Sequence, residues 1–239
     1  MTHSARQDDQ NVRVVFGAGI RKSIAEEVRR LGVSRALVLS TPEQSDAALD
    51  IAGYLSAMAA GVYCKAAMHT PVSVTNDALT HLKTTRADCL VAIGGGSTTG
   101  LGKAIAYRTG LPQIVIPTTY AGSEATALLG QTEDGVKTTL TDPEVLPEVI
   151  LYDPELVVSL PVEMTVTSAL NAMAHAAEAL YAPDRSDAST ELATKGLAAF
   201  VHCLPKVVQD PTDVVAREDT LRGAWACGTV LGRVSMALH

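Results

Sequence analysis

Three glycines and a serine, Gly94–Ser97, follow an apolar run that begins at Cys89, and these residue types could bind a phosphate group. Glycine lacks a Cβ, so the backbone can turn sharply and approach a bound diphosphate closely. A helix that starts directly after the glycines would add unpaired N–H groups and the positive end of its dipole. The cluster therefore predicts a nucleotide site. It comes after several strands and helices, whereas the usual dinucleotide fingerprint follows the first strand of its unit.

A second set of polar side chains lies in the apolar stretch TSALNAMAHAAEALYA. Asn171, His175 and Glu178 are spaced i, i+4 and i+7, which places them on one face of a helix. Polar groups among small apolar neighbours must find hydrogen-bond partners or line a cavity. The pattern predicts either a functional face or a hydrogen-bonded core histidine with Glu178 in solvent.

Hydroxyl groups gather in PTTYAGSE, residues 117–124, directly after another apolar run. Ligands of parallel sheets bind outside the carboxyl ends of the strands, so these side chains could line a cofactor pocket. The alternative is a turn capped by its Thr and Ser side chains. Lys137 could reach a ribose or a substrate carboxylate, or it could simply be solvated.

The elements that must position these residues alternate between strand and helix patterns, which predicts a doubly wound parallel sheet. Strands are expected at 12–16, 36–40, 61–66, 89–93 and 113–117, and helices at 20–31, 43–58, 72–85 and 98–108. A hairpin with its turn at Asp134-Gly135 and one last strand from Val149 follow.

The pattern after Pro161 is helical almost throughout, which predicts a second, all-α domain. Helices are expected at 166–181, 186–203 and 214–236, with breaks at APDRSD, Leu204-Pro205 and Asp210-Pro211. We therefore expect an α/β dinucleotide-binding domain over residues 1–158 and an α-helical substrate domain over residues 159–239. The chain stops at His239 without a helix cap, so we expect the helical domain to be incomplete.

Composition narrows the class of protein further. The 239 residues are 47% hydrophobic, which is enough for a substantial core, and the net charge of -7 with no basic run argues against a nucleic-acid partner. No apolar run approaches the roughly 18 residues of a membrane span, and the first ten residues lack the apolar core of a signal peptide, so a cytoplasmic location is expected. The four cysteines have no CxxC spacing, which indicates reduced core residues.

Taken together, these motifs resemble the iron-containing alcohol dehydrogenase superfamily, and within it the maleylacetate reductases. The resemblance is carried by FGAG, GGGSTTGLGKAIA, PTTYAGSE, KTTLTDPEVLPEVILYDPEL, SALNAMAHAAEALYA and LGRVSMALH. It implies a dehydroquinate synthase-like architecture, in which a dinucleotide-binding domain faces an all-helical domain across a cleft for nicotinamide and substrate. It also implies a homodimer.

The resemblance assigns cofactor contacts residue by residue. It implies pyrophosphate binding by Gly95, Gly96 and Ser97, contacts to the adenine and nicotinamide ends by Thr118 and Thr119, and a lysine near the nicotinamide ribose, Lys137. Many relatives carry an aspartate at the position of Thr41. A neutral residue there would not repel a 2′-phosphate, so we expect NADH or NADPH as the cofactor.

The metal site departs from the family pattern. Metal-dependent relatives bind iron or zinc with an aspartate and three histidines, and the first two ligands are four residues apart on this helix. Asn171 stands where the aspartate would be, and His175 is retained. A neutral amide is a poor substitute for an anionic oxygen ligand, so no tightly bound catalytic metal is expected.

The resemblance implies reduction of the carbon–carbon double bond of maleylacetate, a dicarboxylate, to 3-oxoadipate in the degradation of aromatic compounds. His175, His239, Asn171 and Tyr120 are the candidate catalytic residues, with His239 as proton donor and His175 stabilising the enolate. Two alternatives are a metal-dependent alcohol dehydrogenase of the same superfamily and a catalytically incomplete nucleotide-binding fragment. A purely structural protein would leave the glycine cluster unexplained.

Overall fold

The computed structural model describes residues 3–6 and 12–236. Contacts divide the chain into two compact units. The sheet unit comprises Met1–Pro117 and Ala127–Tyr152, and the helical unit comprises Thr118–Thr126 and Asp153–His239. In the described part of the chain, no helix has the length and apolar character needed to cross a membrane. The functional boundary after residue 158 stays a prediction.

A seven-stranded sheet forms the centre of the sheet unit. Its order is β1-β2-β9-β6-β5-β3-β4, and all neighbouring pairs are parallel except β1 with β2. The strands are β1 His3–Arg6, β2 Arg13–Phe16, β3 Ala36–Leu39, β4 Ala59–Tyr63, β5 Cys89–Gly94, β6 Gln113–Pro117 and β9 Val149–Tyr152. The central strands β3, β5, β6 and β9 are buried along their whole length, because helices cover both faces. The predicted parallel sheet is confirmed.

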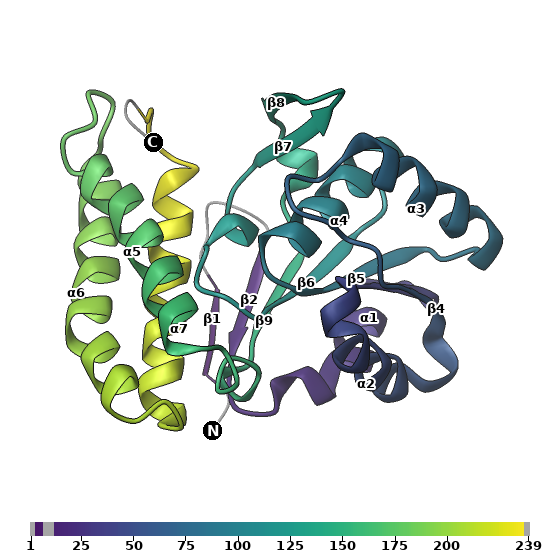
Figure 1. Ribbon diagram of the computed structural model, residues 1–239, viewed down its shortest axis with the longest axis horizontal. Helices are drawn as coiled ribbons and strands as arrows, with labels where there is room; N and C mark the ends of the chain where they lie inside the picture. Colours follow the sequence, from purple (N-terminus) through teal and green to yellow (C-terminus); the bar gives the residue numbers. More distant parts are fainter. Residues whose placement is uncertain (1–2, 7–11, 237–239) are drawn as a thin grey trace. The chain divides into compact units, whose positions relative to one another are not determined.

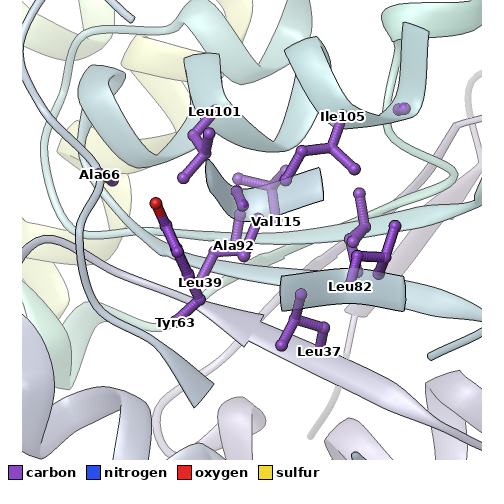
Figure 2. Close-up of a cluster of buried hydrophobic side chains, with 12 residues drawn as sticks. Leu37, Leu39, Tyr63, Ala66, Leu82, Ala92, Leu101, Ile105 and Val115 are labelled. Atoms are coloured by element: carbon purple, nitrogen blue, oxygen red, sulfur yellow. The ribbon is translucent and has the colours of Figure 1, made fainter. Parts of the chain in front are cut away.

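Two pairs of helices lie on opposite faces of this sheet (Figure 1). They are α1 Ile24–Arg30 and α2 Ser45–Leu55 on one face, and α3 Val72–Thr85 and α4 Gly96–Thr109 on the other. Leu37, Leu39, Ala92 and Val115 of the strands pack against α3 and α4 (Figure 2). Alternate residues of a strand point to the same face of the sheet, so these apolar side chains form one surface against which both helices pack.

Several predicted boundaries match the structure and others shift. The helix at 72–85 and the strand at 113–117 have the predicted bounds. The strand expected at 61–66 is Ala59–Tyr63, and the helix expected from residue 20 begins with a 3₁₀ turn, Ile20–Ser23. The predicted hairpin is formed by β7 Leu128–Glu133 and β8 Val136–Thr141.

Three long helices, α5 Val162–Ala179, α6 Asp187–Gln209 and α7 Val214–Leu231, pack side by side in the helical unit (Figure 1). Glycines allow α6 and α7 to approach closely, since a Cβ on Gly196 would lie 2.6 Å from Cys227 Sγ. The predicted break at Leu204-Pro205 is wrong, because Pro205 lies inside α6. Proline removes one N–H bond near the end of this helix, and the carbonyl of the 58% exposed Val201 can bond to water instead.

Candidate functional site

The glycine loop joins β5 to α4 at the carboxyl edge of the sheet, as the sequence predicts. Gly94 has φ +154°, a conformation that side chains rarely adopt. A Cβ at this residue would collide with Thr98 Oγ1 and would lie 2.8 Å from Gln44 Oε1. The close approach therefore requires glycine at position 94.

The first turn of α4 leaves hydrogen-bonding groups available to a ligand. Gly95 precedes the helix in an extended conformation and, as a glycine, has no side chain that could cap the first N–H groups. The hydroxyls of Thr98 and Thr99 are buried, and neither has a hydrogen-bond partner among the described residues. An anion at this helix N-terminus would meet backbone N–H donors and the positive end of the helix dipole.

Thr41 lies on the same edge of the sheet as the glycine loop. It follows β3, which is a parallel neighbour of β5 in a register that pairs Leu39 with Ala92. Glu43 is exposed two residues later, and its pKa is lowered by a backbone hydrogen bond and by the Thr41 side chain. Although Thr41 is neutral, an anionic carboxylate therefore lies beside it.

The hairpin carries Lys137 opposite Thr132, and its side chain is exposed. The hairpin is tied to the rest of the sheet unit by a bond from the Thr132 N–H to the Thr70 carbonyl. A buried lysine that sequence reasoning missed adds to this attachment, since Lys103 Nζ donates to the Leu128 carbonyl at 2.9 Å. Its position in the glycine-loop motif was the available signal.

Thr118 and Thr119 follow β6 directly, and Tyr120 is fully buried in the helical unit. Arg217 Nη1 donates to the Tyr120 hydroxyl at 3.2 Å. Burial raises the pKa of Tyr120, and Arg217 opposes that increase. This contact gives Tyr120 a packing role, while the catalytic role expected from the sequence stays a prediction. The partner was missed because it lies 97 residues away in a stretch typical of a solvated helix face.

The polar face of α5 has the predicted spacing. Asn171 is exposed, His175 is buried, and Asn171 Nδ2 lies 3.3 Å from His175 Nε2. Glu178 is only 4% exposed, so the interpretation that placed it in solvent is wrong. His239 lies outside the described residues.

The predicted site residues thus fall into three groups. Thr41 and the glycine loop share one edge of the sheet, Thr118–Tyr120 pack with the helical unit, and Asn171 and His175 contact each other on α5. Within the described ranges, no three His, Cys, Asp or Glu side chains are grouped so that they could hold a metal ion.

Comparison with known proteins assigns both units to one family. The sequence profile of the iron-containing alcohol dehydrogenases matches residues 11–154, and the profile of the C-terminal part of the same family matches residues 165–239. The chain is 61% identical to a maleylacetate reductase of Rhizobium sp. (strain MTP-10005) over 227 residues, which are 95% of this chain and 65% of the relative.

Two further comparisons agree. A maleylacetate reductase of Burkholderia cepacia is 53% identical over 95% of this chain and 64% of its own length. The crystal structure of maleylacetate reductase from Agrobacterium tumefaciens superposes with a TM-score of 0.94 at 58% identity, covering 100% of this chain and 68% of that one. The chain spans just under two thirds of the length of these curated relatives. It belongs to the iron-containing alcohol dehydrogenase family.

Proposed function

We propose that this chain reduces the carbon–carbon double bond of maleylacetate with NAD(P)H, giving 3-oxoadipate. The observation that carries the proposal is the 61% identity to a maleylacetate reductase over 227 residues, which include both the glycine loop and the α5 motif. The substrate class follows from that relative, and the chain's own residues support the chemistry below.

The glycine loop fits a dinucleotide diphosphate. Gly94 provides a position that a Cβ would fill, and the uncapped turn after it offers N–H donors. We propose that Gly95, Gly96 and Ser97 hold the pyrophosphate, that Thr118, Thr119 and Lys137 contact other parts of the cofactor, and that Thr41 lies near the adenosine ribose. Either NADH or NADPH is proposed as the cofactor.

When bound, the cofactor supplies a hydride to one carbon of the double bond. The negative charge then develops on the conjugated carbonyl oxygen, and a hydrogen-bond donor must stabilise it. His175 is proposed for this role because Asn171 lies 3.3 Å from its Nε2 and restrains the imidazole. His239 is proposed to donate a proton to the adjacent carbon, since a histidine titrates near neutral pH.

We also propose that the reaction proceeds without a resident metal. Membership of an iron-containing family does not support this, so the proposal depends on the donor set alone. Asn171 offers a neutral amide where an anionic ligand would be needed, and the His175 imidazole beside it is a neutral nitrogen ligand. No step is therefore assigned to a metal.

The cofactor site can be tested with two glycine substitutions at opposite ends of α4. Gly94→Ala should abolish NADH binding, because its Cβ would force the loop away from Thr98 and Gln44. Gly110→Ala is the matched control, since Gly110 also has positive φ, at +67°, but has open space around its Cβ position. The measurement is the fluorescence of NADH on titration with each protein. Equal affinities for the two variants would contradict this assignment.

The activity is tested by following oxidation of NADH, and separately NADPH, with maleylacetate in the presence and absence of a chelator. Turnover that chelator leaves unchanged supports the metal-free reductase. Turnover lost on chelation and restored by iron or zinc would instead favour the metal-dependent alternative, and a chain that binds NADH without turnover would be catalytically incomplete.

A cytoplasmic location and a homodimer complete the proposal. The dimer can be tested by measuring the mass of the chain in solution by sedimentation equilibrium, where a single species of about twice 25.0 kDa is expected.

A further inference from the structure

Arg217 is the largest fully buried side chain in the helical unit, and all its hydrogen-bond partners among the described residues are neutral. Nη1 donates to Tyr120 Oη at 3.2 Å and to Thr165 Oγ1 at 2.9 Å. The remaining donors contact the backbone carbonyls of Pro211, Val158 and Leu160. Burying a guanidinium costs free energy unless its N–H donors form hydrogen bonds. Because the guanidinium is planar and rigid, these bonds also fix the positions of its partners.

The partners come from segments that are distant in the sequence. Arg217 is the fourth residue of α7, and Thr165 is the fourth residue of α5. Tyr120 belongs to the 118–126 segment, which leaves the sheet unit after β6 and packs with the helices. Through one nitrogen, Arg217 therefore connects this segment to two helices.

A second contact holds the same segment. Gly122 has φ +75°, and a Cβ on it would lie 2.9 Å from Gly228 Cα and 3.0 Å from the Ala224 carbonyl. Both of these residues are on α7, as is Arg217. The segment therefore contacts α7 at two positions, through the hydrogen bond of Tyr120 and through the close packing of Gly122 two residues later.

We propose that Arg217 is a positioning residue for the cofactor, which acts by holding Tyr120 so that Thr118 and Thr119 are presented in their binding conformation. This inference rests on the proposed function, because it takes the two threonines as cofactor contacts. A binding segment that is already ordered loses less entropy when its ligand arrives. If only a fraction of molecules have the segment in place, the apparent dissociation constant rises by the inverse of that fraction.

The test compares two variants that each remove one partner of Arg217 Nη1. Tyr120→Phe deletes the hydroxyl on the segment, and Thr165→Val deletes the hydroxyl on α5 with little change in shape. Tyr120→Phe should raise the NADH dissociation constant by roughly five- to tenfold. Thr165→Val should leave the NADH dissociation constant within about twofold of its original value. It should lower the thermal stability about as much as Tyr120→Phe does. Arg217→Met should reproduce the Tyr120→Phe effect if it folds.

A second readout does not depend on the cofactor. Hydrogen exchange of amides in residues 118–126 should speed up in Tyr120→Phe and stay slow in Thr165→Val. An unchanged NADH affinity in Tyr120→Phe, or an equal loss in both variants, would overturn the inference. Failure of the unsubstituted chain to bind either NADH or NADPH would overturn the proposed function, and the exchange rates would still decide whether Arg217 holds the segment.

Discussion

Replacing Gly122 by alanine should destabilise the helical unit, and the structure gives the size of the effect. At φ +75° an alanine is in the left-handed region, which costs about 1–2 kcal/mol. Its Cβ would also lie 2.9 Å and 3.2 Å from Gly228 Cα and N. These are backbone atoms of a helix and cannot rotate away, so overpacking adds about 1–3 kcal/mol. The free energy of unfolding should therefore fall by about 2–5 kcal/mol.

The assay is urea denaturation followed by tryptophan fluorescence. Trp225 is the single tryptophan of the chain and lies in α7, so its signal reports on the unit that contains the contact. Gly232→Ala is the control. Gly232 lies at the C-terminal end of α7, the helix that contains Gly228, and its Cβ would have ordinary contacts at 3.6–3.8 Å. A loss of less than about 1 kcal/mol in Gly122→Ala would refute the packing argument, since the backbone conformation alone should cost that much.

Three further outcomes are expected. Burial raises the pKa of Glu148 above its usual 4.5, so its contribution to stability is full below that pH and is lost as pH rises through the raised value. Relative to the unsubstituted chain, Glu148→Gln should therefore gain stability as the pH rises above 4.5, measured by urea denaturation at a series of pH values. Burial raises the pKa of Cys89 and Cys227 to about 12 and also raises the pKa of the buried Cys203, whereas Cys64 is only half-buried. A thiol reagent should accordingly modify one cysteine of the native chain rapidly, and Cys64→Ser should remove that phase. Finally, Glu43→Gln should improve NADPH binding relative to NADH by roughly threefold to tenfold, measured by titration, because the carboxylate beside Thr41 would repel a 2′-phosphate. An unchanged ratio of the NADPH and NADH affinities would show that Glu43 does not influence which cofactor binds.

Local sequence patterns were sufficient for much of the sheet unit. The strand Gln113–Pro117 and the helix Val72–Thr85 have their predicted bounds because short apolar runs and helical periodicity decide them locally. The hairpin turn was equally predictable, since Asp134 and Gly135 both have positive φ, at 50° and 78°, as a two-residue hairpin turn requires.

The contacts of the helical unit could not be predicted in the same way. The local sequence predicts that Arg217 is a solvated charge on its helix, and only the tertiary fold brings it to Tyr120. The continuation of α6 through Pro205 likewise depends on neighbouring structure, because proline is a helix breaker by local rules. The sequence around the glycines at 122 and 228 does not indicate that they contact each other either, because only the tertiary fold brings their backbones together.

The contact between Tyr120 and Arg217 also sets an order of events during synthesis. The arginine is added 97 residues after the tyrosine, which corresponds to roughly 5–20 s at ordinary translation rates. During that interval the sheet strands on either side of the 118–126 segment can already pair, while the segment still lacks α7, the helix that carries Arg217 and Gly228. A nascent chain would therefore expose Tyr120 until α7 leaves the ribosome, and this segment is where a chaperone would find an unburied aromatic side chain.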